Sequence, residues 1–404
     1  MIHLDGMRQS AMVIGGGAVG LVSALSIADH VSEVYVLERN SRIRDDNQST
    51  RNSGVIHAGI YYDPEIAPLK AKLCVEGKER LYSFADEWRV PHRMVGKLVV
   101  AKTETDIEYL DDLVRISELN GVDTEMIDGH DISRYEPNVT GTCALYVPSS
   151  GIIQPERYLQ KLHAACRKKG INVLTDSQVT SIEPEKDGFM VGITRPDGVE
   201  RNFADYVVNS AGVYSDEIAR LMDPDFDLRI APVRGEAYKF DKTQRFALNT
   251  NGMNIYPAPH PFDPKTGEKL DMPYSSFLEH YRKGEVMKTV GVHLTSQLNG
   301  RHLDDYVTVG PALVCGIGKE DYTPSRDPQY FHGRVHWFFE DIRPDDLQFH
   351  QTGLLAKPVG KPDFTIEPSK EYPNLINLVG IDSPGLTSSL GIGNHVGELI
   401  REIR

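Results

Sequence analysis

Three glycines and one glutamate near the start of the chain have the spacing of a dinucleotide-binding turn. Gly15, Gly17 and Gly20 follow a short apolar strand at residues 12–14. In this pattern the first glycine permits a tight turn and the second lets the backbone approach a pyrophosphate, while the third lets the next helix pack closely on the sheet. Glu38 ends a second apolar strand and is placed to accept hydrogen bonds from a ribose. The pattern predicts a bound dinucleotide.

The residues between these landmarks complete the pattern. Ala18 and Val19 open a helical stretch, whose free N–H groups and positive dipole end favour phosphate. The second strand, at residues 34–37, follows that helix in the expected order. A simple glycine-rich turn does not need this strand–helix–strand order.

Two more strand-to-glycine turns occur far along the chain. One leads to Ala211 and Gly212, and the other to Gly385, Leu386 and Thr387. Each can bring backbone N–H groups to an extended cofactor, and three distant segments suit flavin adenine dinucleotide (FAD) better than a nicotinamide. Thr387, Ser388 and Ser389 are available as caps for the last helix. The other expected cofactor contacts are Arg39, Ser53, Gly54, Val179 and Ser388.

Apolar periodicity predicts the elements that position these turns. Helices are expected at residues 67–88, 106–120, 155–169 and 386–403, with another starting near residue 216. Strands are expected at residues 96–102, 172–174, 179–182, 206–209, 290–294 and 375–379, with a hairpin turn at 196–198. Helical periodicity fades between residues 223 and 344, and residues 257–288 are expected to form a long loop with one short helix.

The same order of strand, glycine turn and helix occurs near both ends of the chain. It predicts an α/β fold with a discontinuous Rossmann-like FAD-binding domain. That domain is expected to comprise residues 1–90, 150–222 and 350–404. Residues 91–149 and 223–349 are expected to form an α+β substrate domain on an antiparallel or mixed sheet. Two domains agree with the length of 404 residues.

Composition narrows the class of protein. Forty per cent apolar and 25% charged residues are typical of a soluble globular protein, and a net charge of −14 disfavours nucleic acid as a partner. No apolar run approaches the ~18 residues of a membrane span, and no signal peptide is evident. We therefore expect a cytoplasmic protein, for which peripheral contact with a membrane stays open. The four cysteines form no C-x-x-C pair, so no metal site is expected.

Four stretches carry a resemblance to a known family: NSGVIHAGIYY (52–62), LKAKLCVEG (69–77), GVHLT (291–295) and SPGLTSSL (383–390). With them the chain resembles the L-2-hydroxyglutarate dehydrogenase/oxidase family, within the D-amino-acid-oxidase and glycerol-3-phosphate-dehydrogenase superfamily of flavoproteins. The likeness covers most of the chain, and the first two stretches are the most characteristic. It implies FAD and oxidation of a small 2-hydroxy acid, with hydride transfer to the flavin N5.

Two histidines are candidates for the base that this reaction needs, because imidazole accepts protons near neutral pH. The resemblance implies that His57 lies beside the flavin ring; the alternative is that it only orients the flavin. His293 is the competitor, in an apolar strand, and its alternative role is that of a satisfied core residue.

Lys357, Arg234, Tyr256 and Tyr61 are the expected substrate contacts. The resemblance implies that Arg234 borders the pocket; an ion pair with Glu236 is the alternative, and core packing is the alternative for Tyr256. Strand alternation would bury only one of Tyr61 and Tyr62. One departure matters, because Leu355 stands where the family usually has an arginine, and a planar guanidinium binds carboxylate bidentately.

This departure leaves alternatives open. The scaffold would also suit an amino-acid or amine oxidase, a glycerol-3-phosphate dehydrogenase-like enzyme, or a flavin subunit of an electron-transfer assembly. The electron acceptor is expected to be a quinone, oxygen or a carrier protein.

Overall fold

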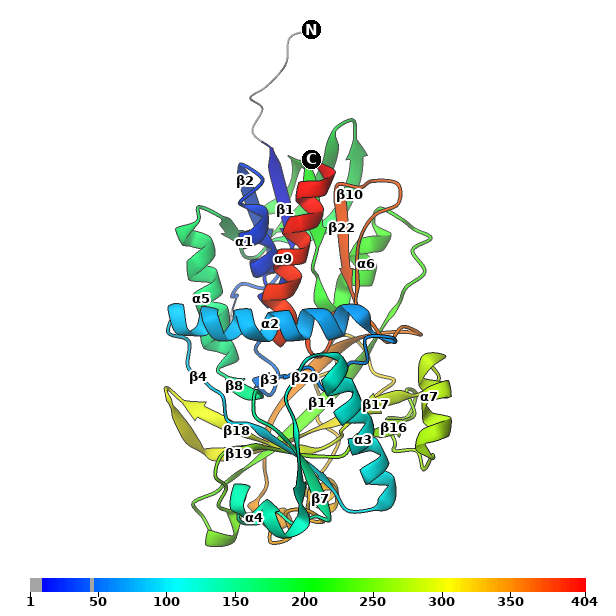
Figure 1. The fold of residues 1–404 in the computed structure, drawn as a ribbon. Helices are drawn as coiled ribbons and strands as arrows, with labels where there is room; N and C mark the ends of the chain where they lie inside the picture. The colour runs from blue at the N-terminus through cyan, green and yellow to red at the C-terminus, as the bar shows by residue number, and fades with distance from the viewer. Residues whose placement is uncertain (1–8, 44–46) are drawn as a thin grey trace.

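The apolar strand around residue 12 is β1 (Ser10–Ile14), which lies inside a six-stranded sheet in the upper half of Figure 1. The structure is a computed structural model and describes residues 9–43 and 47–404. The strand order is β21-β22-β13-β1-β2-β9. All neighbours pair in parallel except β21 with β22. The other strands are β2 (Glu33–Leu37), β9 (Asn172–Leu174), β13 (Tyr206–Asn209), β21 (Thr365–Pro368) and β22 (Leu375–Val379).

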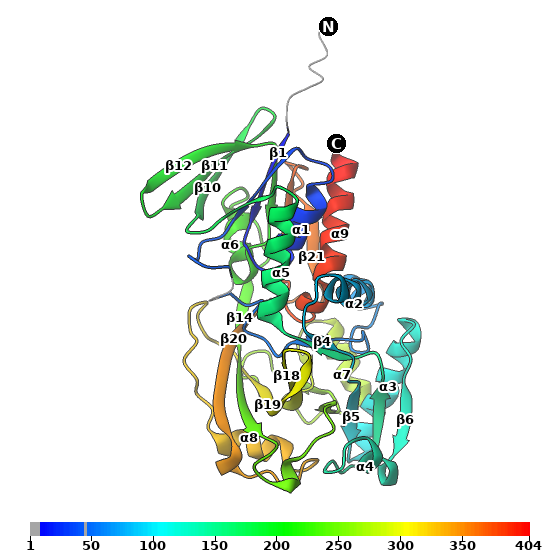
Figure 2. The same ribbon diagram turned by 90° about the vertical axis from the view of Figure 1, so that its left-hand side faces the viewer.

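Successive side chains of β1 point to opposite faces of the sheet and pack into two separate cores. Ala11 and Val13 face the helices, while Met12 and Ile14 face the opposite layer. The helical layer consists of α1 (Ala18–Ile27), α5 (Pro155–Lys168) and α9 (Gly385–Ile403), seen side by side in Figure 2. The opposite layer includes a three-stranded antiparallel sheet of β10 (Gln178–Glu185), β11 (Gly188–Arg195) and β12 (Gly198–Ala204), with α6 (Ser215–Arg220) beside it.

The lower half is built on an eight-stranded sheet with the order β20-β14-β19-β18-β15-β5-β7-β6. Its neighbours are antiparallel except for β15 and β5. The strands are β5 (Lys97–Ala101), β6 (Glu125–Asp128), β7 (Cys143–Val147), β14 (Ile230–Asp241), β15 (Asn254–Pro257), β18 (His293–Asn299), β19 (His302–Val314) and β20 (Gln348–Pro358). Leu98 and Val100 pack into one core of this half, and Val99 and Ala101 into the other.

Four helices cover this sheet: α3 (Glu104–Leu119), α4 (Ile132–Tyr135), α7 (Tyr274–Arg282) and α8 (Pro328–Val335). Thr103 starts α3 because its hydroxyl accepts from the Asp106 N–H while the Asp106 carboxylate accepts from the Thr103 N–H. The short elements are η1 (Gly129–Asp131), η2 (Gly212–Tyr214), η3 (Phe246–Leu248), η4 (Pro344–Asp346) and the two-stranded sheet of β16 (His260–Phe262) and β17 (Met287–Thr289).

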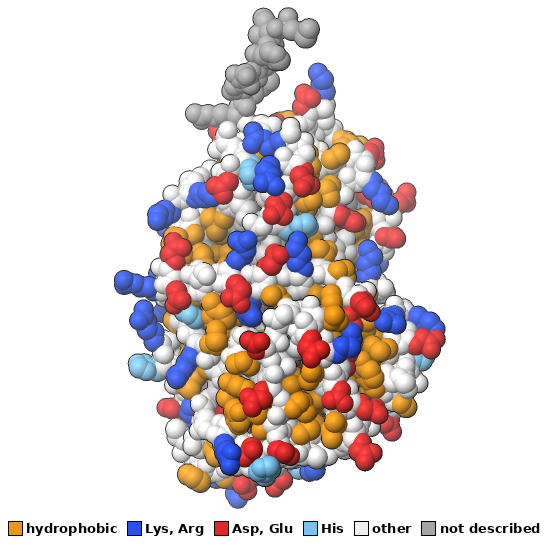
Figure 3. Space-filling view, in the orientation of Figure 1, with side chains coloured by type: hydrophobic (Ala, Val, Ile, Leu, Met, Phe, Trp, Pro, Cys, Tyr) orange, Lys and Arg blue, Asp and Glu red, His pale blue; other side chains and the backbone are white. Residues whose placement is uncertain are grey.

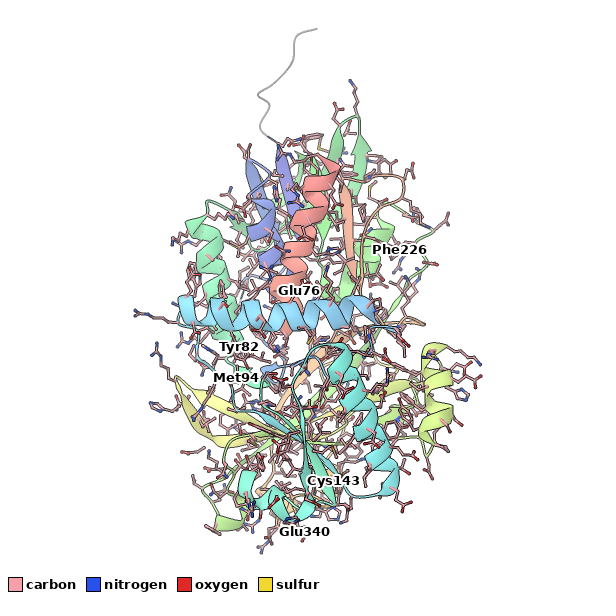
Figure 4. The ribbon with its side chains drawn as sticks, viewed as in Figure 1. Glu76, Tyr82, Met94, Cys143, Phe226 and Glu340 are labelled. Atoms are coloured by element: carbon pink, nitrogen blue, oxygen red, sulfur yellow. The ribbon has the colours of Figure 1, made fainter. Side chains whose placement is uncertain are left out.

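A long helix, α2 (Pro68–Glu87), crosses the molecule between the two halves (Figure 1). It crosses α9 closely, because a Cβ on Gly77 would lie 2.5 Å from the Thr387 carbonyl oxygen. On the side toward the lower half, the Tyr82 hydroxyl donates to the Ser149 carbonyl at 3.2 Å (Figure 4). The small sheet of β3 (Val55–Ile56), β8 (Gly151–Ile153) and β4 (His92–Arg93) completes this junction.

The predicted helices are confirmed with shifts of a few residues, but the region from residue 223 to 344 differs from the expectation. It contains two long strands, β14 and β19, which the loss of helical periodicity did not locate, and the equally unexpected β20 follows directly after it. The expected boundary at residue 350 falls inside β20, which pairs with β14 and so belongs to the eight-stranded sheet. Within residues 257–288 the short helix is confirmed as α7, but β16 and the start of β17 were not predicted.

The surface carries both signs of charge. In the view of Figure 3, Lys and Arg side chains are interspersed with Asp and Glu, and apolar side chains gather mainly in the lower half. Within residues 9–43 and 47–404, no helix is both long enough and apolar enough to cross a membrane.

Candidate functional site

The turn between β1 and α1 needs glycine for steric reasons. Gly15 has φ +108°, and a Cβ there would lie 2.5 Å from the Ser210 carbonyl oxygen. A Cβ on Gly20 would lie only 1.9 Å from the Gly15 carbonyl oxygen. Helix α1 therefore approaches the turn as closely as the sequence pattern implies, and Gly15, Gly17, Ala18 and Val19 line a cavity. Gly20 packs behind the turn, outside the cavity lining.

Glu38 faces the same end of the cavity and is fixed before any ligand binds. Its carboxylate accepts from the N–H groups of Gly16 at 2.8 Å and Asn40 at 2.9 Å, and the residue is only 6% exposed. A carboxylate has about four acceptor positions, so two backbone donors leave capacity for ribose hydroxyls. Arg39 also lines the cavity, but its guanidinium stacks on the Tyr214 ring at 4.1 Å and pairs with Glu320.

The distant turns reach the same cavity. Ala211 and Gly212 line it at the end of β13, and Gly212 has φ +58° with open space where a Cβ would stand. Ser53 and Val179 also line it. Gly54 does not, because it packs against β8, where a Cβ would lie 2.5 Å from the Ile153 carbonyl oxygen.

The start of α9 brings Gly385, Leu386 and Thr387 to the cavity, but the capping expectation is wrong. The helix begins after Pro384 without a side-chain cap, so Thr387, Ser388 and Ser389 all lie inside its first turns. The Thr387 hydroxyl instead accepts from the His57 N–H at 3.1 Å and donates to the Val55 carbonyl at 3.3 Å. Ser388 is buried against Gly77 of α2 and does not line the cavity.

The cavity has a volume of about 730 Å³ and extends from the β1–α1 turn to the eight-stranded sheet. The described residues fit FAD: all three glycine turns line one continuous space, Glu38 holds free acceptor capacity at one end, and buried ring nitrogens stand unpartnered at the other. The residues that would hold FAD are therefore those of the β1–α1 turn, Glu38, the end of β13 and the start of α9.

His57 and His293 meet at the far end of the cavity. The Nδ1 of His293 lies 2.9 Å from the Gly291 carbonyl, which places the proton on Nδ1 and leaves the buried Nε2 without a partner. The Nδ1 of His57 is also buried and unpartnered. Burial, together with the nearby Lys97, lowers the pKa of His57 well below its ordinary value, and burial lowers the pKa of His293 to about 3. Both imidazoles are therefore neutral, and each has a ring nitrogen without a partner.

Tyrosines form the wall around the histidines. The Tyr256 ring stacks on His293 with centroids 3.7 Å apart, and Tyr61 lies 6.4 Å from both His57 and Tyr256. Tyr61 and Tyr62 both line the cavity and both are half-buried, so the alternation expected between them is not observed. The two residues follow β3 in a turn, where strand alternation does not apply.

Lys357 lines the cavity as one of three residues that form an ion-pair cluster. Asp382, which follows β22, lies 2.5 Å from the Lys357 Nζ and 2.7 Å from the Lys70 Nζ. Burial opposes ionisation of Asp382, but the two lysines hold the pKa of its carboxyl below the ordinary value. The cluster carries two positive charges and one negative charge at the cavity wall.

The structure corrects the expectation for Arg234. This residue does not line the cavity; its guanidinium pairs with Glu236 at 2.9 Å and Asp321 at 2.9 Å and donates to Ser325 at 3.1 Å. Arg234 and Glu236 stand two positions apart on β14 and therefore share a face of the sheet. The ion pair raised as an alternative from the sequence is the arrangement observed.

Three residues at this end were not anticipated: Lys70, Lys97 and Asp382. Lys97 opens an apolar strand, which was a signal of a buried charge but not of its surroundings. Lys70 and Asp382 are far apart in the sequence, so nothing local predicts that they pair. The described residues contain no group of three or more His, Cys, Asp or Glu side chains arranged to hold a metal ion.

Comparison with known proteins agrees with this geometry. A family model described as FAD dependent oxidoreductase matches residues 10–399. Among solved structures, the L-α-glycerophosphate oxidase of Mycoplasma pneumoniae, determined with FAD bound, has a TM-score of 0.80 at 21% identity, covering 98% of this chain and 95% of that one. At this identity the likeness concerns the fold. The expectations of FAD and of a Rossmann-like α/β fold are confirmed.

Relatives with an assigned activity identify the family more narrowly. The L-2-hydroxyglutarate dehydrogenase of Indibacter alkaliphilus is 29% identical, over 97% of this chain and 98% of its own length. The mitochondrial L-2-hydroxyglutarate dehydrogenase of Arabidopsis thaliana is 30% identical, over 96% of this chain and 83% of its own length. The chain is therefore an FAD-dependent oxidoreductase and belongs to the L-2-hydroxyglutarate dehydrogenase family.

Proposed function

We propose that the protein oxidises L-2-hydroxyglutarate, or a closely similar 2-hydroxy acid, to the corresponding 2-oxo acid. The observation that carries this proposal is the pair of neutral histidines with free ring nitrogens at the end of the cavity, His57 and His293. Bound FAD supplies the hydride acceptor. The chain must then supply a proton acceptor, a carboxylate partner and a site that excludes water, and residues suited to each role are present.

The proposed base is His57. A neutral imidazole removes the proton from the substrate hydroxyl while the hydride leaves the same carbon. Its backbone is fixed by the Thr387 hydroxyl, which ties this loop to the start of α9. His293 is the second candidate, and its tautomer is already set by the Gly291 carbonyl, with Nε2 as the acceptor.

The proposed substrate contacts are Lys357, Tyr256 and Tyr61, all of which line the cavity. Lys357 is half-buried and its charge is shared with Asp382, so it can also contact a substrate carboxylate. The two tyrosines enclose the reacting carbon and displace water from it, which strengthens electrostatic interactions inside the site. Leu355 also lines the cavity, so the carboxylate recognition that an arginine would give there must come from lysine.

The test is an anaerobic reduction of the purified holoenzyme, followed as loss of the visible flavin absorbance. We expect L-2-hydroxyglutarate to bleach the flavin faster than its D enantiomer, glycerol 3-phosphate or an amino acid. Bleaching by an amino acid or by glycerol 3-phosphate alone would overturn the proposed substrate class. No bleaching with any of these reductants would favour an electron-transfer subunit.

The reoxidising partner is a separate proposal. We infer that a quinone, oxygen or a carrier protein takes the electrons, because the described residues hold no cysteine group for a metal cluster. Reduced enzyme mixed with oxygen or with a soluble quinone, and followed as the return of flavin absorbance, ranks the two small acceptors. Slow return with both would point to a carrier protein.

A further inference from the structure

Lys97 is a buried lysine at the junction of the two halves. It opens β5 and is only 1% exposed. Its ammonium lies 3.8 Å from the centroid of the Tyr256 ring and 4.9 Å from that of Tyr61. In the part of the chain that the structure describes, no carboxylate pairs with it, and burial lowers the pKa of its ammonium. Burying an ammonium without an anionic partner is costly, so a compensating anion is expected nearby.

The lysines that line the cavity and take part in ion pairs are in a different position. Lys70 and Lys357 share Asp382, and Lys288 pairs with Asp112 at 2.9 Å. Each of these lysines therefore has a carboxylate partner within the protein, whereas no carboxylate among the described residues pairs with Lys97.

A tyrosine wall separates Lys97 from the cavity. Tyr61 and Tyr256 line the cavity and also contact the Lys97 ammonium. His293 lies against the Tyr256 ring at 3.7 Å, and a ring cannot hold both an imidazole and an ammonium over one face at these distances. The ammonium and the imidazole therefore occupy opposite faces of Tyr256, so the lysine charge is one ring away from the proposed reaction centre. Across such a short, dry distance it is weakly screened.

We propose that Lys97 is the counter-charge for the substrate carboxylate and selects carboxylates over uncharged alcohols. This rests on the proposed oxidation of a 2-hydroxy acid at the same site. The ammonium acts through the tyrosine wall by electrostatic attraction, while direct hydrogen bonds come from groups that line the cavity. The same charge opposes protonation of His57 and His293, which keeps both imidazoles neutral before the reaction.

The charge of Lys97 also predicts a pH dependence. Burial lowers its pKa to about 7, and only the charged form attracts a carboxylate, so affinity should fall as the pH rises above neutrality. The other titratable groups facing Lys97 and the two histidines stay neutral here, because burial raises the pKa of each; they are Tyr61, Tyr62, Tyr256 and the thiol of Cys74. The ammonium of Lys78, on α2, also faces Cys74 and stays outside the cavity lining.

The experiment measures binding of an unreactive carboxylate, glutarate, to the oxidised holoenzyme through the change in the flavin visible spectrum. Its neutral counterpart is glutaramide, the diamide of the same chain. Lys97→Met should weaken glutarate binding by about tenfold or more, as expected for loss of a unit charge a few ångströms away. It should change glutaramide binding less than about twofold, and Lys97→Arg should keep most of the glutarate affinity.

Lys239→Met is the matched control, because Lys239 also lies over a tyrosine ring, that of Tyr306 at 4.9 Å, but outside the cavity lining. It should bind glutarate like the wild type. Equal glutarate affinity in Lys97→Met and the wild type would overturn the proposal. Where Lys97→Met does not fold, the wild type decides: glutarate affinity should fall between pH 6 and 9, and a constant affinity would overturn the proposal.

These outcomes are separate from failure of the proposed function. A wild-type enzyme that binds glutarate through Lys97 but is not bleached by any 2-hydroxy acid keeps the Lys97 assignment and overturns the reaction. If L-2-hydroxyglutarate bleaches the wild-type enzyme but Lys97→Met binds glutarate normally, the reaction is kept and the Lys97 assignment is overturned. Absence of glutarate binding in the wild type would contradict the Lys97 assignment, whereas the bleaching test alone decides the reaction.

Discussion

The two ends of the cavity are built in different ways. At the β1–α1 end, recognition depends on backbone N–H groups and on missing Cβ atoms within a few consecutive residues, as at Gly15 and Gly20. At the other end it depends on side-chain charge and burial, and the residues come from separate elements, such as Lys97 on β5 and His293 on β18. Substitutions at the first end should therefore remove the cofactor, and those at the second should leave a yellow but slower enzyme.

The largest effect is expected at Gly20. Gly20→Ala places a Cβ 1.9 Å from the Gly15 carbonyl oxygen, so α1 must move away from the turn. We expect loss of bound FAD and a destabilisation of about 4 kcal/mol or more. Flavin absorbance per protein and thermal unfolding measure the two effects. Gly333→Ala, in α8 where the added Cβ meets open space, is the control and should keep its flavin.

The next effect concerns the proposed base. His57→Ala should retain FAD but reduce it about 10²- to 10⁴-fold more slowly with substrate, the usual contribution of a general base. Anaerobic stopped-flow absorbance measures the rate. His293→Ala is the paired variant; if it carries the larger loss, His293 is the base and His57 has an orienting role.

The pH dependence of flavin reduction tests the same two histidines in a second way. A base must be unprotonated, so the rate falls as the pH drops through its pKa, and burial lowers that pKa below 6.5 for both His57 and His293. At saturating substrate, where the affinity change expected from Lys97 does not affect the rate, we expect flavin reduction to remain constant from pH 8 down to below about 6. A rate that halves near pH 6.5 would show that an exposed histidine, or a different group, accepts the proton.

A smaller effect is expected at Glu38. Glu38→Gln removes the charge that accepts from two backbone N–H groups, and charged hydrogen bonds contribute about 1.5–3 kcal/mol each. We therefore expect FAD affinity to weaken by roughly 10- to 100-fold, measured by flavin fluorescence on titration of the apoprotein. The rate of flavin reduction at full occupancy should not change. If Glu38→Gln changes the rate of flavin reduction but not the affinity for FAD, Glu38 acts on the reaction as well, and the two ends of the cavity do not have separate roles.

The smallest effect is expected at Lys357. Lys357→Met should raise the substrate concentration for half-maximal reduction by about tenfold, because one charged hydrogen bond to carboxylate is lost. Asp382 keeps its pair with Lys70 at 2.7 Å, so the fold and the bound FAD should be retained. If saturation is unaffected while the maximal rate falls, Lys357 acts on the reaction centre rather than on binding.

The same contrast explains what the sequence could predict. The β1–α1 turn and Glu38 are local, and spacing alone placed them correctly at the cavity. The Thr387 hydroxyl was misassigned because cap preference competes with the tertiary bonds it makes to Val55 and His57. Long antiparallel strands such as β14 pair with partners far away in the chain, so their pattern was not recognised from periodicity.

The charged residues of the substrate end were the least predictable. Whether a lysine or arginine faces a ligand or an acid depends on what folds beside it. Arg234 forms ion pairs with Glu236 and Asp321, whereas the Lys97 ammonium lies over two tyrosine rings. Strand alternation already placed Arg234 and Glu236 on one face, and that was the single local signal available.

The most direct test of the whole account is stoichiometric. Holoenzyme under anaerobic conditions is titrated with L-2-hydroxyglutarate while flavin absorbance and the 2-oxo acid formed are both measured. We expect complete bleaching, with one 2-oxo acid formed per flavin. A spectrum that stays oxidised in excess substrate, with no 2-oxo acid formed, would contradict it.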